Sequence, residues 1–216
     1  MKKYDYILWD LDGTISDSAP GIVNSVVYAL EHMGTEIGDR GSLTKFVGPP
    51  LSESFSRYYG YTPAQTDEAV RFFREYYREK GIYENAIYPG LEALLERLKA
   101  AGRVCVVATS KPEVHAKTIL SRYGIDQHFR YIAGSPLDDA GTTKDQVISY
   151  ALRAAGITDK ARTVMVGDRS HDCVGARTNG LDCIGVLYGY GDHEELKAAG
   201  ALALARDVDE LAQLLL

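Results

Sequence analysis

Short apolar runs alternate with helical patterns in the second part of the chain, from about residue 85 to residue 216. Between the runs, apolar residues recur at the spacing of one helix face. The runs that predict buried strands are 104–108, 131–133, 163–166, 183–186 and 201–204. Continuous apolar strands separated by helices are typical of a parallel sheet that helices cover on both faces. This part of the chain is therefore predicted to be an α/β unit.

The preceding segment, residues 16–84, has helical periodicity and no convincing strand. Its first apolar stripe ends at Gly34, a residue that commonly follows the last turn of a helix. A further apolar run at 6–9 comes before this segment and predicts one more strand. We therefore predict a Rossmann-like parallel-sheet core, made of residues 1–15 and 85–216, that is interrupted by an α-helical insertion at 16–84.

The first predicted strand ends in two carboxylates, Asp10 and Asp12, which Gly13 and Thr14 follow. Alternate side chains of an extended chain point to the same side, so both carboxylates can face one site. Two carboxylates this close repel each other unless a cation or a shared proton lies between them. The spacing therefore indicates a metal site, acid–base catalysis or both, although Asp and Gly are also common in plain turns.

Other polar side chains follow later predicted strands or begin the helices after them: Thr109, Ser110, Lys144, Asp168 and Asp172. In open α/β sheets, ligands bind outside the carboxyl ends of the strands. A lysine in the first turn of a helix is unfavourable against the helix dipole, which favours a functional reason for Lys144. The convergence of these groups on one edge of the sheet predicts an active site there.

Each of these segments also has a purely structural interpretation. Ser110 can cap a helix that begins at about Pro112, and Thr143 and Ser170 can cap the two later helices. Capping and phosphate binding are compatible, because a helix N-terminus offers backbone N–H groups and positive potential to an anion. Taken one at a time, these segments leave their function open.

Composition and charge narrow the class of protein. The chain has 216 residues, of which 45% are hydrophobic and 25% are charged, as in an ordinary globular protein with a substantial core. The net charge of −6 disfavours a bound nucleic acid polymer but allows a local positive pocket for one phosphate. The three cysteines lack CxxC spacing, and no apolar run reaches the ~20 residues that span a bilayer. We therefore expect buried, reduced thiols, no membrane partner and a cytoplasmic location.

Taken in order, four segments resemble the signature motifs of the haloacid dehalogenase-like hydrolase superfamily. They are Asp10-Leu11-Asp12-Gly13-Thr14, Thr109, Lys144 and Gly167-Asp168-Arg169-Ser170-His171-Asp172. The helical insertion lies where that family carries a cap domain. Asp17-Ser18, the segment 46–51 and Thr109-Ser110-Lys111-Pro112 resemble the phosphoglycolate phosphatase-like branch. The resemblance extends over the whole chain.

This resemblance implies catalytic roles for the aspartates. Asp10 would be the nucleophile that forms an aspartyl-phosphate, and Asp12 would act as general acid and then as general base. Mg²⁺ would be held by Asp10, Asp168 and the backbone carbonyl of Asp12.

The resemblance also implies residues that bind or position the phosphoryl group. Gly13, Thr109 and Ser110 would contact its oxygen atoms, and Lys144 would balance the charges of the nucleophile and the phosphate. Asp172 would orient a metal-bound water or Lys144 without binding the metal directly.

Two assignments stay open at this point. Lys111 lies at a predicted helix start, but Lys144 follows a further strand, as the third motif does in the family, and is preferred as the charge-balancing lysine. Gly48 lies in a stiff Gly-Pro-Pro turn of the cap and is a candidate to meet the phosphate or substrate. Lys45 and Arg57 are nearby cations that are equally well interpreted as solvated.

The predicted function is hydrolysis of a small phosphate ester, such as phosphoglycolate, a sugar phosphate or a mononucleotide, with Mg²⁺ as cofactor. The main enzymatic alternative is a phosphoglucomutase-like isomerase, which uses the same two aspartates. A phosphate-binding or partner-binding module is the non-enzymatic alternative, and its usual mark is the loss of Asp10, Asp12 or Asp168. All three aspartates are present. The sequence names neither the physiological substrate nor the oligomeric state.

Overall fold

The computed structural model of the chain describes residues 3–137 and 141–216. They form two units, which we call the core unit and the helical unit. The core unit comprises Met1–Ser16 and Ile87–Leu216, and the helical unit comprises Asp17–Ala86. Each unit has its own packed interior and is described by itself.

The chain passes from one unit to the other at two very short strands. These are β2 (Ser16–Asp17) and β3 (Ala86–Ile87), which pair with each other. The sequence-based boundaries, after residue 15 and before residue 85, lie within two residues of these strands.

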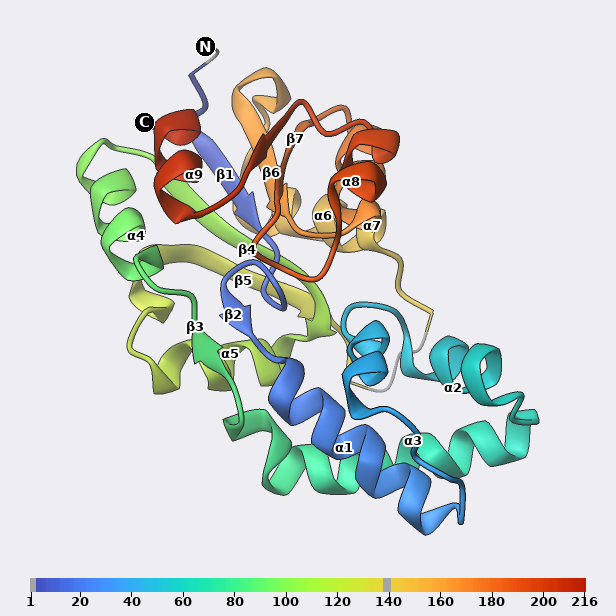
Figure 1. The fold of residues 1–216 in the computed structure, drawn as a ribbon. Coiled ribbons are helices and arrows are strands. Elements are labelled where there is room, and N and C mark those ends of the chain that lie inside the picture. The colour runs from blue at the N-terminus through green and yellow to red at the C-terminus, as the bar shows by residue number, and fades with distance from the viewer. Residues whose placement is uncertain (1–2, 138–140) are drawn as a thin grey trace. The chain divides into compact units, whose positions relative to one another are not determined.

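The core unit is built on a six-stranded sheet in the order β5-β4-β1-β6-β7-β8 (Figure 1). Its strands are β1 (Tyr6–Trp9), β4 (Val104–Pro112), β5 (Phe129–Ser135), β6 (Thr163–Gly167), β7 (Asp182–Val186) and β8 (Ala203–Ala205). The pairings between neighbouring strands of this sheet are parallel. The predicted Rossmann-like α/β core is therefore confirmed.

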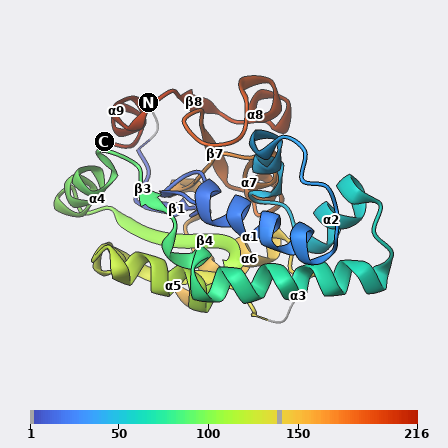
Figure 2. The ribbon, with the colours of Figure 1, turned by 60° about the horizontal axis from the view of Figure 1, so that its bottom comes forward.

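Helices flank this sheet on both faces. They are α4 (Leu91–Ala100), α5 (Glu113–Arg122), α6 (Lys144–Ala154), α7 (Ser170–Thr178), α8 (His193–Ala199) and α9 (Val208–Leu215), with short 3₁₀ turns η3 (Asp126–His128) and η4 (Lys160–Arg162). The connections through α4 and α5 run towards β5, whereas those through α6, α7 and α8 run towards β8. Right-handed crossovers in opposite directions place their helices on opposite faces, and Figure 2 shows α4 and α5 grouped apart from α7 and α8.

The bodies of the central strands are apolar and fully buried. Leu8 of β1, Val106 of β4 and Met165 of β6 have no exposed surface and pack in one cluster with apolar residues of α6, α7 and α8. Trp9 at the end of β1 is level with Val107 of β4 and with Val166 of β6. This register brings the residues that follow the three strand bodies to the same edge of the sheet.

The helical unit is built from α1 (Ala19–His32), η1 (Arg40–Phe46), α2 (Leu51–Tyr59), α3 (Pro63–Glu79) and η2 (Gly81–Tyr83). α1 packs along α3, and α2 packs against α3 and η1. Phe46 and Phe55 are buried, with ring centroids 5.0 Å apart, so aromatic side chains form much of this interior. Among the described residues of both units, no helix combines the length and the apolar character that crossing a membrane requires.

Candidate active site

The carboxyl ends of β1, β4 and β6 meet where the chain topology of the sheet reverses direction. Asp10 directly follows β1, Thr109 lies two residues beyond the position level with Trp9 on β4, and Asp168 holds the equivalent place after β6. Such switch points leave a crevice outside the strand ends, which is where open α/β sheets bind ligands. The strand register therefore accounts for the meeting of side chains more than 150 residues apart in sequence.

Lys144 joins two of the aspartates. Its Nζ atom lies 2.7 Å from Asp10 Oδ1 and 2.7 Å from Asp172 Oδ1, and its side chain is almost completely buried. Burial acts to lower the pKa of Lys144, but the charges of Asp10 and Asp172 more than offset it, so the pKa is raised. The ammonium group therefore stays charged, and it is positioned by α6, whose first residue it is.

Asp168 is fully buried and held on both carboxylate oxygens. Thr14 Oγ1 donates to its Oδ1 at 3.3 Å, and the backbone N–H of Tyr190 donates to its Oδ2 at 2.8 Å. Gly13, with φ at +81°, passes so close that a Cβ atom there would lie 2.1 Å from Asp168 Oδ2. Gly13 is thus required for the approach of the first motif to Asp168, which is a different role from the predicted contact with phosphate.

Asp172 has two roles at the start of α7. Its Oδ1 pairs with Lys144, and its Oδ2 accepts a hydrogen bond from the backbone N–H of Arg169 at 3.0 Å. The N-terminal cap interaction of α7 is therefore made by Asp172, and the interpretation of Ser170 as the cap is wrong. Ser170 instead donates its own backbone N–H to Glu195 at 2.7 Å.

The carboxylates of Asp10, Asp168 and Asp172 form a buried cluster. One oxygen from each lies within 4.8 Å of one from each of the others. Burial first, and then the charges of Asp172 and Asp10, raise the pKa of Asp168 well above its usual range, and burial also raises that of Asp172. One ammonium group does not balance three carboxylates, so the cluster favours an additional cation. Hard oxygen donors of this kind fit Mg²⁺, and these residues could hold a metal ion.

Asp12 is paired with the other candidate lysine. Lys111 Nζ lies 3.1 Å from Asp12 Oδ2, and Asp12 Oδ1 is buried without a hydrogen-bond partner among the described residues. The side chain of Asp12 is thus held by a lysine, which leaves its backbone carbonyl for the predicted contact with a metal. The sequence presented Lys111 and Lys144 as alternatives, whereas the structure pairs each of them with a different aspartate.

The position of Lys111 reflects an unexpectedly long strand. β4 continues through Ser110 and Lys111 to Pro112, and α5 begins only at Glu113 without a side-chain cap. The interpretation of Ser110 as a helix cap is therefore wrong. The interpretation of Thr143 is confirmed, because it forms a capping box with Gln146 at the start of α6.

The remaining predicted residues lie at three places. Thr109 is buried at the site, and its Oγ1 accepts the backbone N–H of Lys111 at 3.2 Å. Ser110 is partly exposed, and its carbonyl accepts a hydrogen bond from Ser135 at 2.9 Å. Gly48 belongs to the helical unit, where it adopts a φ of +101° between η1 and α2.

The loop after β7 was missed by sequence reasoning. Tyr188 donates its hydroxyl to the carbonyl of Thr14 at 3.1 Å, and burial raises the pKa of this hydroxyl. Tyr190 contributes the N–H that binds Asp168. The glycines on both sides of Tyr190 are the available signal, because closely spaced glycines mark places where backbone approaches other groups.

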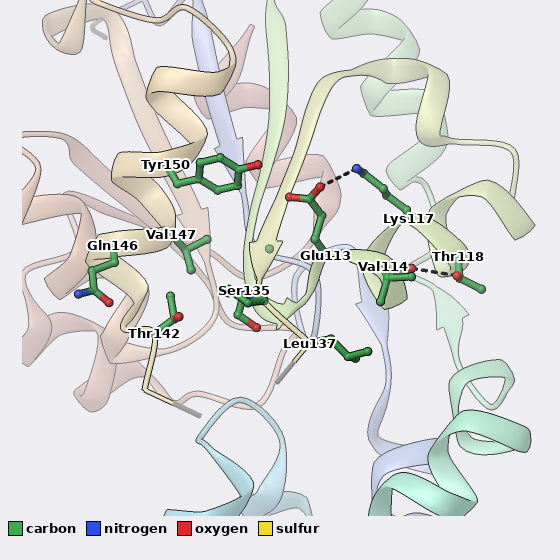
Figure 3. A pocket seen from close by; sticks show the side chains of 12 residues that line it. Glu113, Val114, Lys117, Thr118, Ser135, Leu137, Thr142, Gln146, Val147 and Tyr150 are labelled. Atoms are coloured by element: carbon green, nitrogen blue, oxygen red, sulfur yellow. Dashed lines mark hydrogen bonds and ion pairs between the residues drawn. The ribbon is translucent and has the colours of Figure 1, made fainter. Parts of the chain in front are cut away.

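A cavity of about 890 Å³ lies at the edge of the sheet beyond β5. Figure 3 shows Glu113 and Lys117 from α5 and Val147 and Tyr150 from α6 around it. The aspartates described above do not line this cavity, and neither do Thr109, Lys111 and Lys144. The buried charges at the strand ends, rather than this cavity, therefore define the candidate active site.

Fold and site together define a hydrolase of the α/β type with a carboxylate cluster at the switch point of its sheet. The family model described as haloacid dehalogenase-like hydrolase matches residues 7–186. The chain therefore belongs to the haloacid dehalogenase-like hydrolases, as the motifs predicted.

Individual relatives cover nearly the whole chain. A protein from Pseudomonas aeruginosa named 5'-nucleotidase is 42% identical over 99% of this chain and 96% of its own length. A protein from Mycobacterium tuberculosis named tyrosine-protein kinase PtkA is 39% identical over 97% of this chain and 72% of its own. The crystal structure of a predicted phosphatase from Clostridium acetobutylicum has a TM-score of 0.93 and 46% identity, and the match covers 98% of both chains. The family and its phosphatase members confirm the predicted enzyme class, a phosphatase.

Proposed function

We propose that the protein is a Mg²⁺-dependent phosphomonoester hydrolase that acts on small phosphorylated metabolites through a phosphoryl group carried by Asp10. The observation that carries this proposal is the buried cluster in which Asp10 meets Asp168, Asp172 and Lys144. A phosphate dianion and an aspartate repel each other, so covalent phosphoryl transfer to a carboxylate requires positive charge of this kind nearby.

Asp10 is the nucleophile because a substrate reaches it more easily than the other two carboxylates of the cluster. Its side chain is 11% exposed, whereas that of Asp172 is completely buried and Asp168 has no exposed surface. Asp10 attacks phosphorus, and the bond from phosphorus to the ester oxygen breaks. Lys144 balances the charge of Asp10 as this occurs.

Asp12 moves the protons of both half-reactions. It gives a proton to the departing alkoxide, and it then takes a proton from the water that attacks the phosphoryl group on Asp10. This second step releases inorganic phosphate and restores both aspartates. The chemistry that Mg²⁺ supplies when bound is neutralisation of charge on the phosphoryl oxygens and on the carboxylates of Asp10 and Asp168. Thr109 and Ser110 bind the phosphoryl oxygens.

The proposed substrates are small phosphate esters, and mononucleotides are the first to test because of the name of the relative from Pseudomonas aeruginosa. Phosphoglycolate and sugar phosphates complete the proposed set. The helical unit is proposed to act as the cap that selects the leaving group, with the turn at Gly48 as its candidate contact. In this unit Lys45 Nζ lies 4.3 Å from the ring centroid of Tyr58, a cation–π contact. Lys45 and Tyr58 are therefore proposed as further residues that select the substrate.

The proposal is tested by phosphate release from p-nitrophenyl phosphate and from a panel of metabolite phosphates, each with Mg²⁺ or with a chelator. We expect Mg²⁺-dependent turnover by the wild type and a loss on the order of 10⁴-fold or more in Asp10→Asn. Asp209→Asn, which changes an exposed aspartate of α9, is the matched control and should keep full activity. Full activity of Asp10→Asn, or a folded wild type inert on the whole panel, would contradict the proposal.

A second candidate function is transfer of the phosphoryl group to an acceptor other than water. The 39% identity with a relative named a tyrosine-protein kinase favours it. Comparing phosphate released with substrate consumed separates the two, because a hydrolase releases one phosphate for each ester cleaved. Release of less phosphate than ester consumed would instead support a transfer reaction. Recovery of the substrate's phosphoryl group on a protein would indicate the transferase, and its recovery on a second sugar would indicate the phosphoglucomutase-like isomerase.

A further inference from the structure

We propose that Lys111 is a positioning residue for Asp12, holding one carboxylate oxygen so that the other faces the oxygen of the leaving group. The inference rests on the proposed function, because it requires Asp12 to be the general acid. The observations behind it are the 3.1 Å contact from Lys111 Nζ to Asp12 Oδ2 and the absence of a described partner on Asp12 Oδ1.

The two oxygens of Asp12 are therefore not equivalent. The Lys111 side chain is only 6% exposed, so its ammonium is poorly hydrated and Asp12 Oδ2 replaces part of its lost solvation. Oδ1 is buried as well, and a buried carboxylate oxygen without a donor is unfavourable unless a group that binds later supplies one. The leaving-group oxygen and, afterwards, the attacking water are groups that exchange a proton with it.

The backbone around Lys111 is built to aim this side chain. The register between β4 and β5 shifts between Ala108 and Pro112, as at a β-bulge. Bulges near active sites redirect side chains. The neighbouring strand approaches closely here, since a Cβ atom on Gly134 would lie 2.5 Å from the carbonyl oxygen of Lys111. The bulge and this close packing fix the backbone from which Lys111 reaches Asp12.

Lys144 cannot perform the same task. Its ammonium already lies 2.7 Å from both Asp10 and Asp172, and within the described part of the chain Asp12 is paired with Lys111 instead. The two lysines therefore divide the work. Lys144 balances the charge of the nucleophile, Asp10, and Lys111 holds the proton donor, Asp12. After the proton has moved to the alkoxide, the negative charge of Asp12 lies beside the Lys111 ammonium.

The experiment uses two substrates that differ in their need for a proton. p-Nitrophenolate leaves as a stable anion, whereas an alkyl phosphate, such as the best mononucleotide or sugar phosphate of the panel, needs protonation of its leaving oxygen. We expect Lys111→Met to lower kcat/KM for the alkyl phosphate roughly 10- to 100-fold. This ratio reports the transfer of the phosphoryl group to Asp10 and not the later hydrolysis, which is the same for both substrates and also uses Asp12. We expect little change in kcat/KM for p-nitrophenyl phosphate, and recovery of most activity in Lys111→Arg. Lys117→Met, which removes an exposed lysine paired with Glu113 on α5, is the matched control and should behave as wild type.

Asp12→Asn calibrates the result and separates the two proposals. Its kcat/KM should show the same preference for p-nitrophenyl phosphate with a larger loss, roughly 10²- to 10⁴-fold on the alkyl phosphate. Because Lys111 acts through Asp12, the double variant should be no slower on the alkyl phosphate than Asp12→Asn alone. If Asp12→Asn lowers kcat/KM equally for both substrates, the general-acid assignment fails and the inference with it.

Three results would overturn the role of Lys111 while the proposed function stands. Equal losses of kcat/KM on both substrates would indicate a structural role. A rise in KM without a change in kcat would indicate substrate binding, and additive losses in the double variant would exclude action through Asp12. Thermal unfolding of each variant verifies that it is folded. If Lys111→Met is not folded, Lys111→Gln is measured in its place against the same criteria.

Discussion

The body of the central sheet and its carboxyl end both contain fully buried residues, but these residues have opposite kinds of side chain. In the body, Leu8 and Met165 have no exposed surface and pack against apolar residues. Just beyond the end of β6, Asp168 and, in the first turn of α7, Asp172 are equally buried but have ionisable carboxyl groups. Burial of apolar surface stabilises a fold, whereas burial of carboxylates beside one another opposes it. The comparison indicates that the body of the sheet maintains the fold and that its end is kept for function.

The largest expected effect is on activity, from Asp168→Asn. Asparagine keeps the shape but removes one of three clustered carboxylates and one proposed ligand of the metal. We expect a loss of turnover on the order of 10⁴-fold, together with an unchanged or higher free energy of unfolding in chelator. Mg²⁺ at about 100 times its Kd should stabilise the wild type by about 2.7 kcal/mol and should stabilise the variant far less. Urea denaturation with and without Mg²⁺ measures the free energy of unfolding in chelator and the stabilisation by the metal. A clear loss of stability of Asp168→Asn in chelator would show that the buried carboxylate helps to maintain the fold.

Lys144→Met should reduce both stability and activity. It leaves Asp10 and Asp172 buried without their ammonium partner, and breaking a buried pair in this way costs about 3–5 kcal/mol. The matched control is Lys117→Met, whose ion pair with Glu113 is exposed and should contribute about 1 kcal/mol or less. Denaturant midpoints of the two variants provide the measurement. Similar midpoints would show that burial does not determine how much each ion pair contributes to stability.

Leu8→Ala tests whether the body of the sheet maintains the fold without contributing to catalysis. Truncating a fully buried leucine should cost about 2–5 kcal/mol of unfolding free energy. The side chain lies among apolar residues rather than at the strand end, so kcat of the folded variant should stay near that of the wild type. Steady-state kinetics well below the unfolding temperature measure this, and a selective fall in kcat without unfolding would assign the strand body a catalytic role.

The smallest expected effect is the pH dependence contributed by Cys105. Burial raises the pKa of its thiol from near 9 to about 11, so the folded state holds the proton more tightly than the unfolded state. This contribution is complete below about pH 9 and is lost as the pH rises through about 11, at no more than about 1.4 kcal/mol per pH unit. Between those values the wild type should lose more unfolding free energy than Cys105→Ala. Parallel curves for the two proteins would contradict this assignment.

The strand bodies could be predicted from the sequence because their burial leaves a direct trace in it. Runs such as 104–108 and 163–166 are continuous and apolar, as strands covered on both faces must be. The order of the strands has no such trace, because β6 pairs with β1 although β5 precedes it in the chain. The aspartates were recognisable because Asp10 and Asp168 directly follow such runs, and the register of β1 with β6 brings those two ends together.

The pairing of Lys111 with Asp12 could not be predicted in the same way. Pro112 and Glu113 read as the start of a helix, which made Ser110 look like its cap. The structure extends β4 to Pro112 through contacts with β5 and a register shift, neither of which has a local sequence signal. The backbone of Tyr190 was missed for a related reason, since a main-chain N–H leaves no trace in the identity of its residue. Sequence thus specified which residues carry charge, and tertiary packing specified which charges meet.

Asp10 is proposed to carry the phosphoryl group, and trapping the phosphorylated protein tests this role most directly. A short incubation with a good substrate and Mg²⁺, followed by acid quench and mass spectrometry of peptides, would locate the modification. We expect one phosphoryl group on the peptide that contains Asp10, present in the wild type and in Lys117→Met and absent in Asp10→Asn. Rapid turnover with no phosphorylated peptide at any quench time, or a phosphoryl group that persists in Asp10→Asn, would contradict it.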